Sequence, residues 1–174
     1  MKIRDIKTRI KNFFFVHPTE KLRVRQIERS VNIPLPSAIR YVKELIGEGI
    51  LRKITISNTD FYTADRSSKR FLEEKRLFNL KSLPPLIEYI IAEYNNPVIV
   101  LLGSYSRGED TENSDIDLYV EHPSRIKGIE KFEKSLKRDI QIFNYKSINE
   151  VRNKEFANNI ANGIVMNGFL EVFS

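Results

Sequence analysis

The chain has 174 residues, with 29 Lys+Arg against 23 Asp+Glu, a formal net charge of +6, and neither Cys nor Trp. This length allows one domain or two small ones, and 41% apolar residues argue against wholesale disorder. The sequence contains neither an apolar run of the ~20 residues that a membrane helix needs nor a signal-peptide pattern. The absence of Cys excludes disulfides and thiolate metal sites. We expect a soluble, cytoplasmic protein that does not contact membranes.

The charge is distributed unevenly along the chain. Residues 1–80 hold 18 Lys+Arg and 9 Asp+Glu, a net charge of +9, whereas residues 81–174 hold 11 and 14, a net charge of −3. A basic half joined to an acidic half indicates two modules with different partners. The basic module favours a nucleic-acid partner. The alternative is that the surplus Lys and Arg side chains simply solvate a surface.

The first 47 residues predict three helices. Apolar side chains recur at helical spacing over residues 3–16, 24–31 and 36–47. His17-Pro18 ends the first helix, because the residue before a proline is pushed out of the helical region, and Pro36 favours the start of the third. We expect the third helix to bury one apolar stripe, which consists of Ile39, Val42, Leu45 and Ile46.

Residues 51–63 predict two short strands around the turn Ser57–Asp60. Three helices followed by a β-hairpin is the winged helix-turn-helix order. Residues 3–65, most clearly the stretch VRQIERSVNIPLPSAIRYVKELIGEGILRK, resemble the winged-helix DNA-binding domains of prokaryotic regulators. The resemblance implies a DNA-binding domain over residues 1–65, although some modules with this element order bind only protein.

A DNA-binding winged helix places its third helix in the major groove. Arg40 suits the edge of a guanine, whereas Lys43 suits a phosphate, and basic residues of the hairpin would contact the DNA backbone. The alternative is an ordinary solvated helix face. The expected contacts on the outward side of the helix and on the hairpin are Ser37, Arg40, Tyr41, Lys43, Arg52 and Lys53.

Residues 66–84 are expected to form a helical linker to a second domain over residues 85–174. Ser67 or Ser68 can cap a helix in this segment. Pro84-Pro85 interrupts the chain and can begin another helix that continues to Tyr94.

The acidic half carries the residues that point to chemistry. Val98–Leu102 is a continuous apolar run that predicts a buried strand, and the glycine that follows it allows close backbone approach. The next predicted strand, Asp115–Val120, places Asp115 and Asp117 on one face, because residues two apart in a strand point the same way. Two adjacent carboxylates repel each other, so a divalent cation such as Mg²⁺ is the natural compensation.

Three short motifs follow one another here: Gly103-Ser104, Arg107-Gly108 and Ser114-Asp115-Ile116-Asp117. In this order and spacing they resemble the nucleotidyltransferase superfamily related to DNA polymerase beta, particularly its minimal nucleotidyltransferases, over most of residues 97–145. The whole chain resembles archaeal proteins that join a winged helix to such a domain. The resemblance implies an α+β fold, in which a winged helix-turn-helix domain is followed by a nucleotidyltransferase domain with a mixed β-sheet flanked by helices.

The resemblance also implies an activity, the Mg²⁺- or Mn²⁺-dependent transfer of a nucleoside monophosphate from an NTP, ATP in the first place, to an acceptor hydroxyl. Asp115 and Asp117 would hold the metal ions and, with Asp139, form the catalytic set. Arg107 has an alternative role in an ion pair with Glu109 or Asp110. The residues implied in nucleotide binding are Gly103, Ser104, Arg107 and Ser114.

The family normally contributes a third carboxylate from a neighbouring strand, for which residues 138–145 are the candidate. The corresponding position holds Gln141, between two isoleucines. Asp139 lies two residues earlier on the same face, about 6.6 Å away along a strand. A register shift or bulge would bring Asp139 into place; otherwise the site lacks its third carboxylate.

Two functions remain open on these residues, besides an inactive interaction scaffold. One is a nucleotidyltransferase whose acceptor is a protein, a small molecule or a nucleic-acid end; relatives in toxin–antitoxin pairs modify a partner protein. The other is a DNA-binding transcriptional regulator whose second domain binds nucleotide without turning it over, which Gln141 favours.

The C-terminal segment, residues 147–174, shows helical spacing that includes Ile164 and Val165. It is expected either to cover the sheet or to form a subunit contact in a homodimer. The two histidines, His17 and His122, are isolated in sequence and predict no zinc site. The side chains available for the subunit contact are Phe169, Val172 and Phe173.

Overall fold

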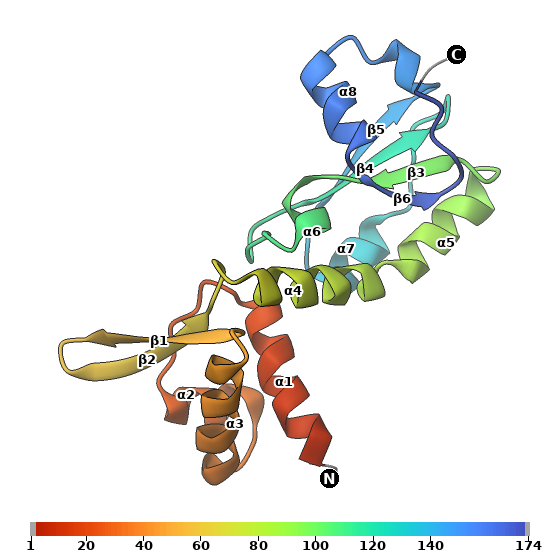
Figure 1. Cartoon of the computed structure of the whole chain (residues 1–174). Helices are drawn as coiled ribbons and strands as arrows, with labels where there is room; N and C mark the ends of the chain where they lie inside the picture. The colour runs from red at the N-terminus through yellow and green to blue at the C-terminus, as the bar shows by residue number, and fades with distance from the viewer. Residues whose placement is uncertain (1–2, 173–174) are drawn as a thin grey trace. The chain divides into compact units, whose positions relative to one another are not determined.

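The computed structural model describes residues 3–172 as an α+β protein (Figure 1). The chain divides into two compact units, Met1–Phe78 and Asn79–Ser174, and each unit has its own hydrophobic core. The division falls within one helix, α4 (Lys69–Ser82). Within residues 3–172, none of the helices combines the length and the apolarity that crossing a bilayer requires.

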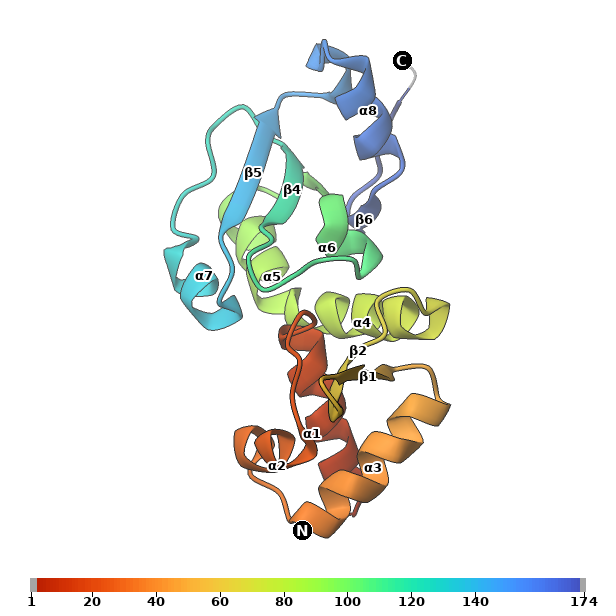
Figure 2. The same cartoon turned by 90° about the vertical axis from the view of Figure 1, so that its left-hand side faces the viewer.

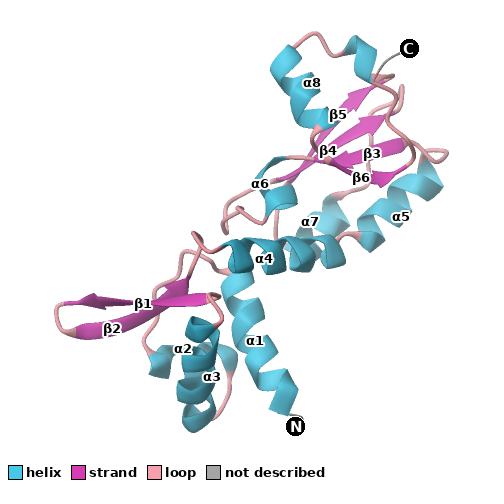
Figure 3. Cartoon of the chain, in the orientation of Figure 1, coloured by secondary structure: helices cyan, strands magenta, loops and turns pink. Residues whose placement is uncertain are grey.

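Three helices and a hairpin build the first unit (Figure 3). The helices are α1 (Ile3–Val16), α2 (Val24–Val31) and α3 (Leu35–Gly47), within one residue of their predicted bounds. The strands β1 (Leu51–Ile56) and β2 (Thr59–Ala64) pair antiparallel. Ser57 and Asn58 between them both have positive φ, at 47° and 58°, as a two-residue turn that matches the strand twist requires.

The core of the first unit collects the apolar faces of its helices. Ile6, Ile10 and Phe14 of α1 are four residues apart and all buried, so they form one stripe along the helix. Lys75 of α4 is only 1% exposed. Its ammonium group donates a hydrogen bond of 2.7 Å to the carbonyl of Phe15, at the end of α1, where a cation is favoured by the helix dipole.

The buried stripe of α3 differs from the predicted one. Ile39 is 54% exposed, whereas Tyr41, which was expected to face outward, is 5% exposed. A helix buries positions i, i+3, i+4 and i+7, and starting this series at Ala38 rather than Ile39 includes Tyr41. The buried residues are Ala38, Tyr41, Val42 and Leu45. Tyr41 is therefore a core residue, and Ile39 takes its place on the outward side.

A four-stranded mixed sheet forms the centre of the second unit. Its strands are β3 (Val98–Leu101), β4 (Ile116–Glu121), β5 (Ile140–Tyr145) and β6 (Ile164–Asn167). Their order is β5-β4-β3-β6 (Figure 1). β4 and β6 both run antiparallel to β3, and β5 runs parallel to β4; Figure 2 shows β4 and β5 side by side.

Helices cover both faces of this sheet (Figure 1). α5 (Pro84–Glu93) and α7 (Glu130–Leu136) pack on one face. The short helix η1 (Ile148–Glu150) and α8 (Lys154–Ala161) pack on the other. A five-residue helix, α6 (Gly103–Arg107), follows β3 directly. The mixed sheet flanked by helices confirms the α+β expectation for this half of the chain.

The C-terminal segment contains a strand where a helix was expected. Ile164 and Val165 belong to β6, which pairs with β3. Gly163 makes this pairing possible, because a Cβ atom there would lie 2.9 Å from the carbonyl oxygen of Leu101. Of the three side chains named for a subunit contact, Phe169 is 79% and Val172 40% exposed, and Phe173 lies outside the described residues.

Candidate functional site

The turn from β3 into α6 is the most constrained feature of the second unit. Leu102 donates a backbone hydrogen bond of 2.8 Å to the carbonyl of Asp117, which holds the end of β3 against β4. Gly103 follows with φ +68°, and a Cβ atom on it would lie 2.2 Å from Oδ2 of Asp117. Only glycine allows both this backbone conformation and this closeness. Gly103, which was predicted to bind nucleotide, therefore lies directly beside Asp117, which was predicted to bind metal.

The two carboxylates of the Asp-Ile-Asp motif stand at the start of β4. Ile116 and Leu118 point into the core and are fully buried, as the alternation predicts. Asp115 precedes the strand and is exposed, whereas Asp117 lies within it and is half-buried. Burial, together with the negative charge of Asp115, raises the pKa of Asp117 above its ordinary value.

The pairing of β4 with β5 settles the position of the third carboxylate. Asp117 pairs with Gln141 in an uninterrupted parallel ladder from Ile116–Ile140 to Glu121–Tyr145. Asp139 instead lies beside Asp115, and its carbonyl accepts a hydrogen bond of 2.9 Å from Ile116. No register shift occurs in this ladder to bring Asp139 forward, so Gln141, and not Asp139, pairs with Asp117.

Asp117 and Gln141 line a cavity of about 460 Å³ beneath α8, which we name the α8 cavity. Gly103 and Arg107 contribute to it from α6. The ring centroids of Phe143 and Phe156 lie 4.8 Å apart, and both rings are half-buried. Both rings line the cavity, and the other lining residues are Leu102, Ser106, Asn159, Asn162 and Gly163.

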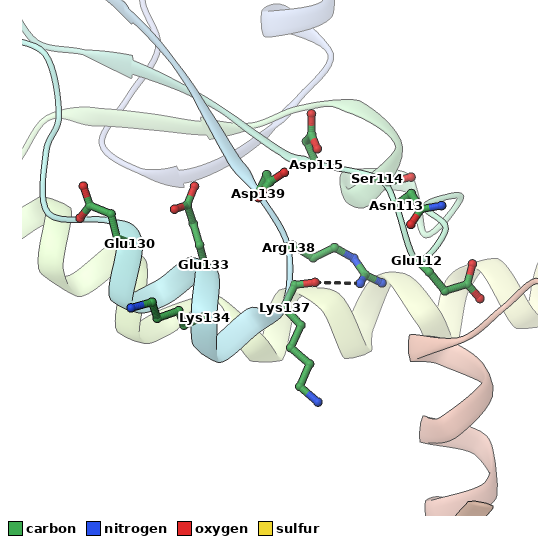
Figure 4. Close-up of a pocket in the computed structure, with 10 residues that line it drawn as sticks. All are labelled: Glu112, Asn113, Ser114, Asp115, Glu130, Glu133, Lys134, Lys137, Arg138 and Asp139. Atoms are coloured by element: carbon green, nitrogen blue, oxygen red, sulfur yellow. Dashed lines mark hydrogen bonds between the residues drawn. The ribbon is translucent and has the colours of Figure 1, made fainter.

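Asp115 and Asp139 line a different cavity of about 560 Å³, which lies beside α7 and which we name the α7 cavity. Figure 4 shows both carboxylates near the starts of β4 and β5. α7 and the segment after it contribute charges of both signs, and Arg138 donates a hydrogen bond of 3.1 Å to the carbonyl of Lys137 (Figure 4). The other lining residues are Glu112, Asn113, Ser114, Glu130, Glu133, Lys134, Lys137 and Arg138.

The other residues predicted to bind nucleotide, Ser104, Arg107 and Ser114, do not lie in one cavity. Arg107 lines the α8 cavity and also forms an ion pair with Glu109, with 2.6 Å between Nε and Oε2; this pair was one of the alternatives. Ser104 is half-exposed on α6 and is not among the described residues that line either cavity. The Ser114 hydroxyl accepts a hydrogen bond of 2.9 Å from the Thr111 amide and lies in the α7 cavity.

A buried polar cluster holds α6 and the loop after it in position. Asp110 and Asn79 are each only 1% exposed. The carboxamide of Asn79 donates to Oδ1 of Asp110 at 2.7 Å and to the carbonyl of Tyr105 at 2.9 Å. Two segments about 30 residues apart in sequence are thereby joined by one side chain.

A metal ion would be held by Asp115 and Asp117. In the part of the chain that the structure describes, no group of three or more His, Cys, Asp or Glu side chains is arranged to hold a metal ion. Two carboxylates nevertheless suit Mg²⁺, which is commonly bound by one or two of them together with waters and substrate phosphates. Burial and the negative charge of Asp115 both raise the pKa of Asp117, and a cation bound beside its carboxylate would counteract both effects.

The α8 side of the site contains residues that sequence reasoning assigned to packing. The helical spacing over residues 147–174 predicts a segment that covers the sheet, and it does not single out Phe156, Asn159 or Asn162 as site residues. The stretch Phe156–Gly163 is rich in carboxamides, which is the signal that could have drawn attention to it. This stretch reaches the cavity that contains Asp117 because β6, which follows α8, pairs with β3.

The residues predicted to bind DNA also have defined positions in the first unit. Arg40 and Lys43 are exposed on α3, and Arg40 forms an ion pair of 3.0 Å with Glu44. Ser37 is half-buried, and Arg52 and Lys53 are exposed on β1. A largely apolar groove of about 260 Å³ between α3 and the hairpin is lined by Val24, Ile39, Val42, Lys43, Ile46, Lys53 and Tyr62.

Comparison with known proteins bears on the second unit. Residues 86–162 match the family described as "Nucleotidyltransferase domain", and no curated protein matches the chain significantly. A solved structure, "Crystal structure of Pseudomonas aeruginosa HmgR", is similar over 73% of this chain at 18% identity and a TM-score of 0.37. This chain covers 49% of that one, about half its length. The segment from 86 to 162, which holds Gly103, Asp117 and Gln141, thus matches the nucleotidyltransferase domain family.

Proposed function

We propose that the second unit transfers a nucleoside monophosphate from an NTP to an acceptor hydroxyl, with a divalent cation at Asp115 and Asp117. The observation that carries the proposal is the contact between Gly103 and Asp117 in the α8 cavity. This contact brings two features together in one cavity. One is the Gly103 turn, whose backbone faces the cavity, and the other is the carboxylate of Asp117, which can bind a cation. The match of residues 86–162 to the nucleotidyltransferase domain supports the same chemistry.

The reaction forms one bond and breaks one bond. The acceptor oxygen bonds to the α-phosphorus, the bond from this phosphorus to the bridging oxygen breaks, and pyrophosphate leaves. Asp115 and Asp117 would hold the divalent cation, which would supply electrostatic stabilisation of the charge on the phosphate oxygens. Gly103 and Arg107 contact the nucleotide phosphates in the α8 cavity. Asp139, beside Asp115, accepts the proton of the acceptor hydroxyl.

The acceptor reaches the site from the α7 cavity, which contains Asp115 and Asp139. The side chains that line this cavity are polar or charged (Figure 4). Such a lining suits a polar acceptor. A hydroxyl on a protein surface fits such an open, charged surface well, so a partner protein is the acceptor that we place first.

The first prediction tests the carboxylate. The full chain is incubated with Mg²⁺, α-labelled NTPs and cell extract, and label transfer is measured. Because Asp117 is the carboxylate that contacts the Gly103 turn, Asp117→Asn should reduce transfer by at least about 100-fold, a typical effect of removing one preorganised electrostatic group. Glu88→Gln removes a carboxylate from the exposed side of α5 and should leave transfer unchanged. Equal transfer by both variants would contradict the proposal.

A second function is favoured by one observation, the pairing of Gln141 with Asp117. A carboxamide cannot accept the proton that a carboxylate accepts. On this alternative the second unit binds nucleotide without turnover, and the chain acts as a DNA-binding transcriptional regulator.

The second prediction separates the two functions. Gln141→Glu places a carboxylate beside Asp117 and should raise the transfer rate by about 100-fold if the displaced position of Asp139 as the base limits the reaction. Asp139→Asn should abolish transfer in the natural background but have little effect in the Gln141→Glu background. If both the natural protein and the Gln141→Glu variant bind nucleotide but transfer no label, the regulator function is favoured.

The first unit is proposed to be a winged helix that binds DNA with α3 in the major groove. Its order of elements and the exposed cations Arg40, Lys43, Arg52 and Lys53 support this. Ile39, exposed beside Arg40, offers an apolar contact that suits the methyl group of a thymine. Tyr41 is excluded from the contact set, because it is buried in the core.

A further inference from the structure

The wall of the α8 cavity that β5 and α8 form has a composition that phosphate binding does not explain. It combines two aromatic rings, Phe143 and Phe156, with the carboxamides of Gln141, Asn159 and Asn162. Phosphate groups are held by cations, backbone amides and hydroxyls. This wall therefore faces another part of the ligand, one that is flat, apolar on its surface and polar along its edge.

We propose that this wall binds the nucleobase and that Asn159 selects adenine. The proposal rests on the function proposed above, because it assumes that the nucleotide phosphates lie at Gly103 and Asp117 in the same cavity. It adds a residue that determines which NTP the site accepts.

The fold places the wall at the right position relative to the phosphate end. Gln141, Phe143 and Tyr145 alternate along β5 and share one face of the sheet. Gln141 pairs with Asp117, and Phe143 lies about 6.6 Å further along the strand. The ring of Phe156 packs against Phe143, so the aromatic part of the wall is one step further from the metal-binding carboxylates than Gln141.

α8 brings its carboxamides to the same cavity from the opposite side. A Cβ atom on Gly163, just after α8, would lie 2.8 Å from Cδ2 of Leu102, so the end of the helix is fixed beside the Gly103 turn. Asn159 lies one helical turn before Gly163, because four residues make about one turn. Asn159 therefore reaches the cavity between the Gly103 turn and the aromatic rings.

The hydrogen-bonding state of these carboxamides indicates which of them can read a base. The side-chain amide of Asn162 (Nδ2) donates a hydrogen bond of 2.8 Å to the backbone carbonyl of Asn158. The side chains of Asn159 and Gln141 make no hydrogen bond to any residue in the range 3–172. Each has one donor and one acceptor group for a ligand.

A carboxamide matches adenine better than guanine. Adenine presents its N6 amino donor beside the N7 acceptor, and Asn or Gln can contact both at once. The same edge of guanine presents two acceptors, O6 and N7, which favour Arg or Lys. The cation that lines this cavity, Arg107, is paired with Glu109. The two half-buried rings can stack on any of the four bases, so the selection is assigned to the carboxamide edge.

The test measures equilibrium binding of the full chain to the α,β-methylene analogues of ATP, GTP, CTP and UTP in Mg²⁺, by titration calorimetry. The ATP analogue should bind most tightly. Asn159→Ala should weaken its binding about tenfold and change the binding of the CTP and UTP analogues less than twofold. Asn158→Ala is the matched control, because this neighbour is exposed outside the cavity, and it should leave all four affinities unchanged. Phe156→Leu should weaken all four.

The outcomes separate this inference from the function on which it rests. Equal affinity of the natural chain for all four analogues, or an equal loss for all four in Asn159→Ala, would overturn base selection by Asn159 and leave nucleotide binding intact. Absence of binding to any analogue would overturn both. Thermal melting of the variants confirms that each is folded, which the exposed position of Asn159 favours.

Discussion

Gly103 is the residue on which the geometry of the candidate site depends most directly. Its φ of +68° lies in the left-handed region, and the space where a side chain would begin is filled by the carboxylate of Asp117. Asp117 is in turn fixed by its own backbone, because its carbonyl accepts the Leu102 amide. Two residues 14 positions apart thus constrain each other through both backbone and side chain.

Gly103→Ala should therefore impair both the site and the fold. We expect a loss of about 1–3 kcal/mol in the free energy of unfolding, from the strained backbone, and the loss of label transfer, because Asp117 must move. Chemical denaturation and the transfer assay measure the two effects. Gly47→Ala is the control, because a Cβ atom there meets nothing within 4 Å and its φ is not positive. Unchanged transfer by Gly103→Ala would show that the contact is dispensable.

At the scale of elements, α6 and the loop after it are held by the Asn79 carboxamide. Asn79→Ala would leave the buried carboxylate of Asp110 without one of its hydrogen-bond donors. Since an unsatisfied buried polar group is costly, we expect a loss of about 1–3 kcal/mol in unfolding free energy. Asn158→Ala, in an exposed position, should change stability by less than about 0.5 kcal/mol. A double variant with Asp110→Ala that is no less stable than Asn79→Ala alone would confirm the coupling.

The elements that sequence reasoning predicted well are those with a long, regular pattern. α1, α2, α3 and α5 begin and end within about one residue of their predicted bounds, because each carries an apolar stripe and a proline or turn at its end. α6 has five residues, too few for any periodicity. The segment of α7 was not assigned, since only Phe132 of its residues is buried.

The site was predictable where it depends on one strand and its neighbour. The alternation in β4 and β5 predicted that Asp115 and Asp117 share a face and that Gln141 occupies the third position. The α8 cavity was not predictable, because it depends on β6 pairing with β3, a contact between residues about 65 apart. The buried stripe of α3 was wrong for a simpler reason: hydrophobicity favoured Ile39, whereas packing against the core buried Tyr41.

At the scale of the whole molecule, the uneven charge has a consequence that can be measured. The excess of positive charge falls on residues 1–80, which include the exposed Arg40 and Lys43 of α3. If α3 contacts DNA, each Lys or Arg that neutralises a phosphate releases counterions. The observed affinity for DNA should then fall steeply as salt rises.

The proposal for α3 predicts a change in this salt dependence. Arg40→Ala together with Lys43→Ala should weaken DNA binding and reduce the slope of log affinity against log salt by about 2, if both side chains meet phosphates. If Arg40 instead reads a base, the slope should fall by only about 1, and discrimination between DNA sequences should weaken by about 1–3 kcal/mol. The same affinity measurements at several salt concentrations, on specific and random DNA, distinguish these results.

The matched control removes the same charge elsewhere in the first unit. Lys69→Ala together with Arg76→Ala changes two exposed cations on α4. Because neither belongs to α3 or the hairpin, this pair should leave the slope unchanged. If the two double variants lose affinity equally, binding responds only to total charge, and the contact surface is not α3. If neither variant changes the slope, neither α3 nor α4 contributes phosphate contacts, and the proposal that α3 lies in the major groove is wrong.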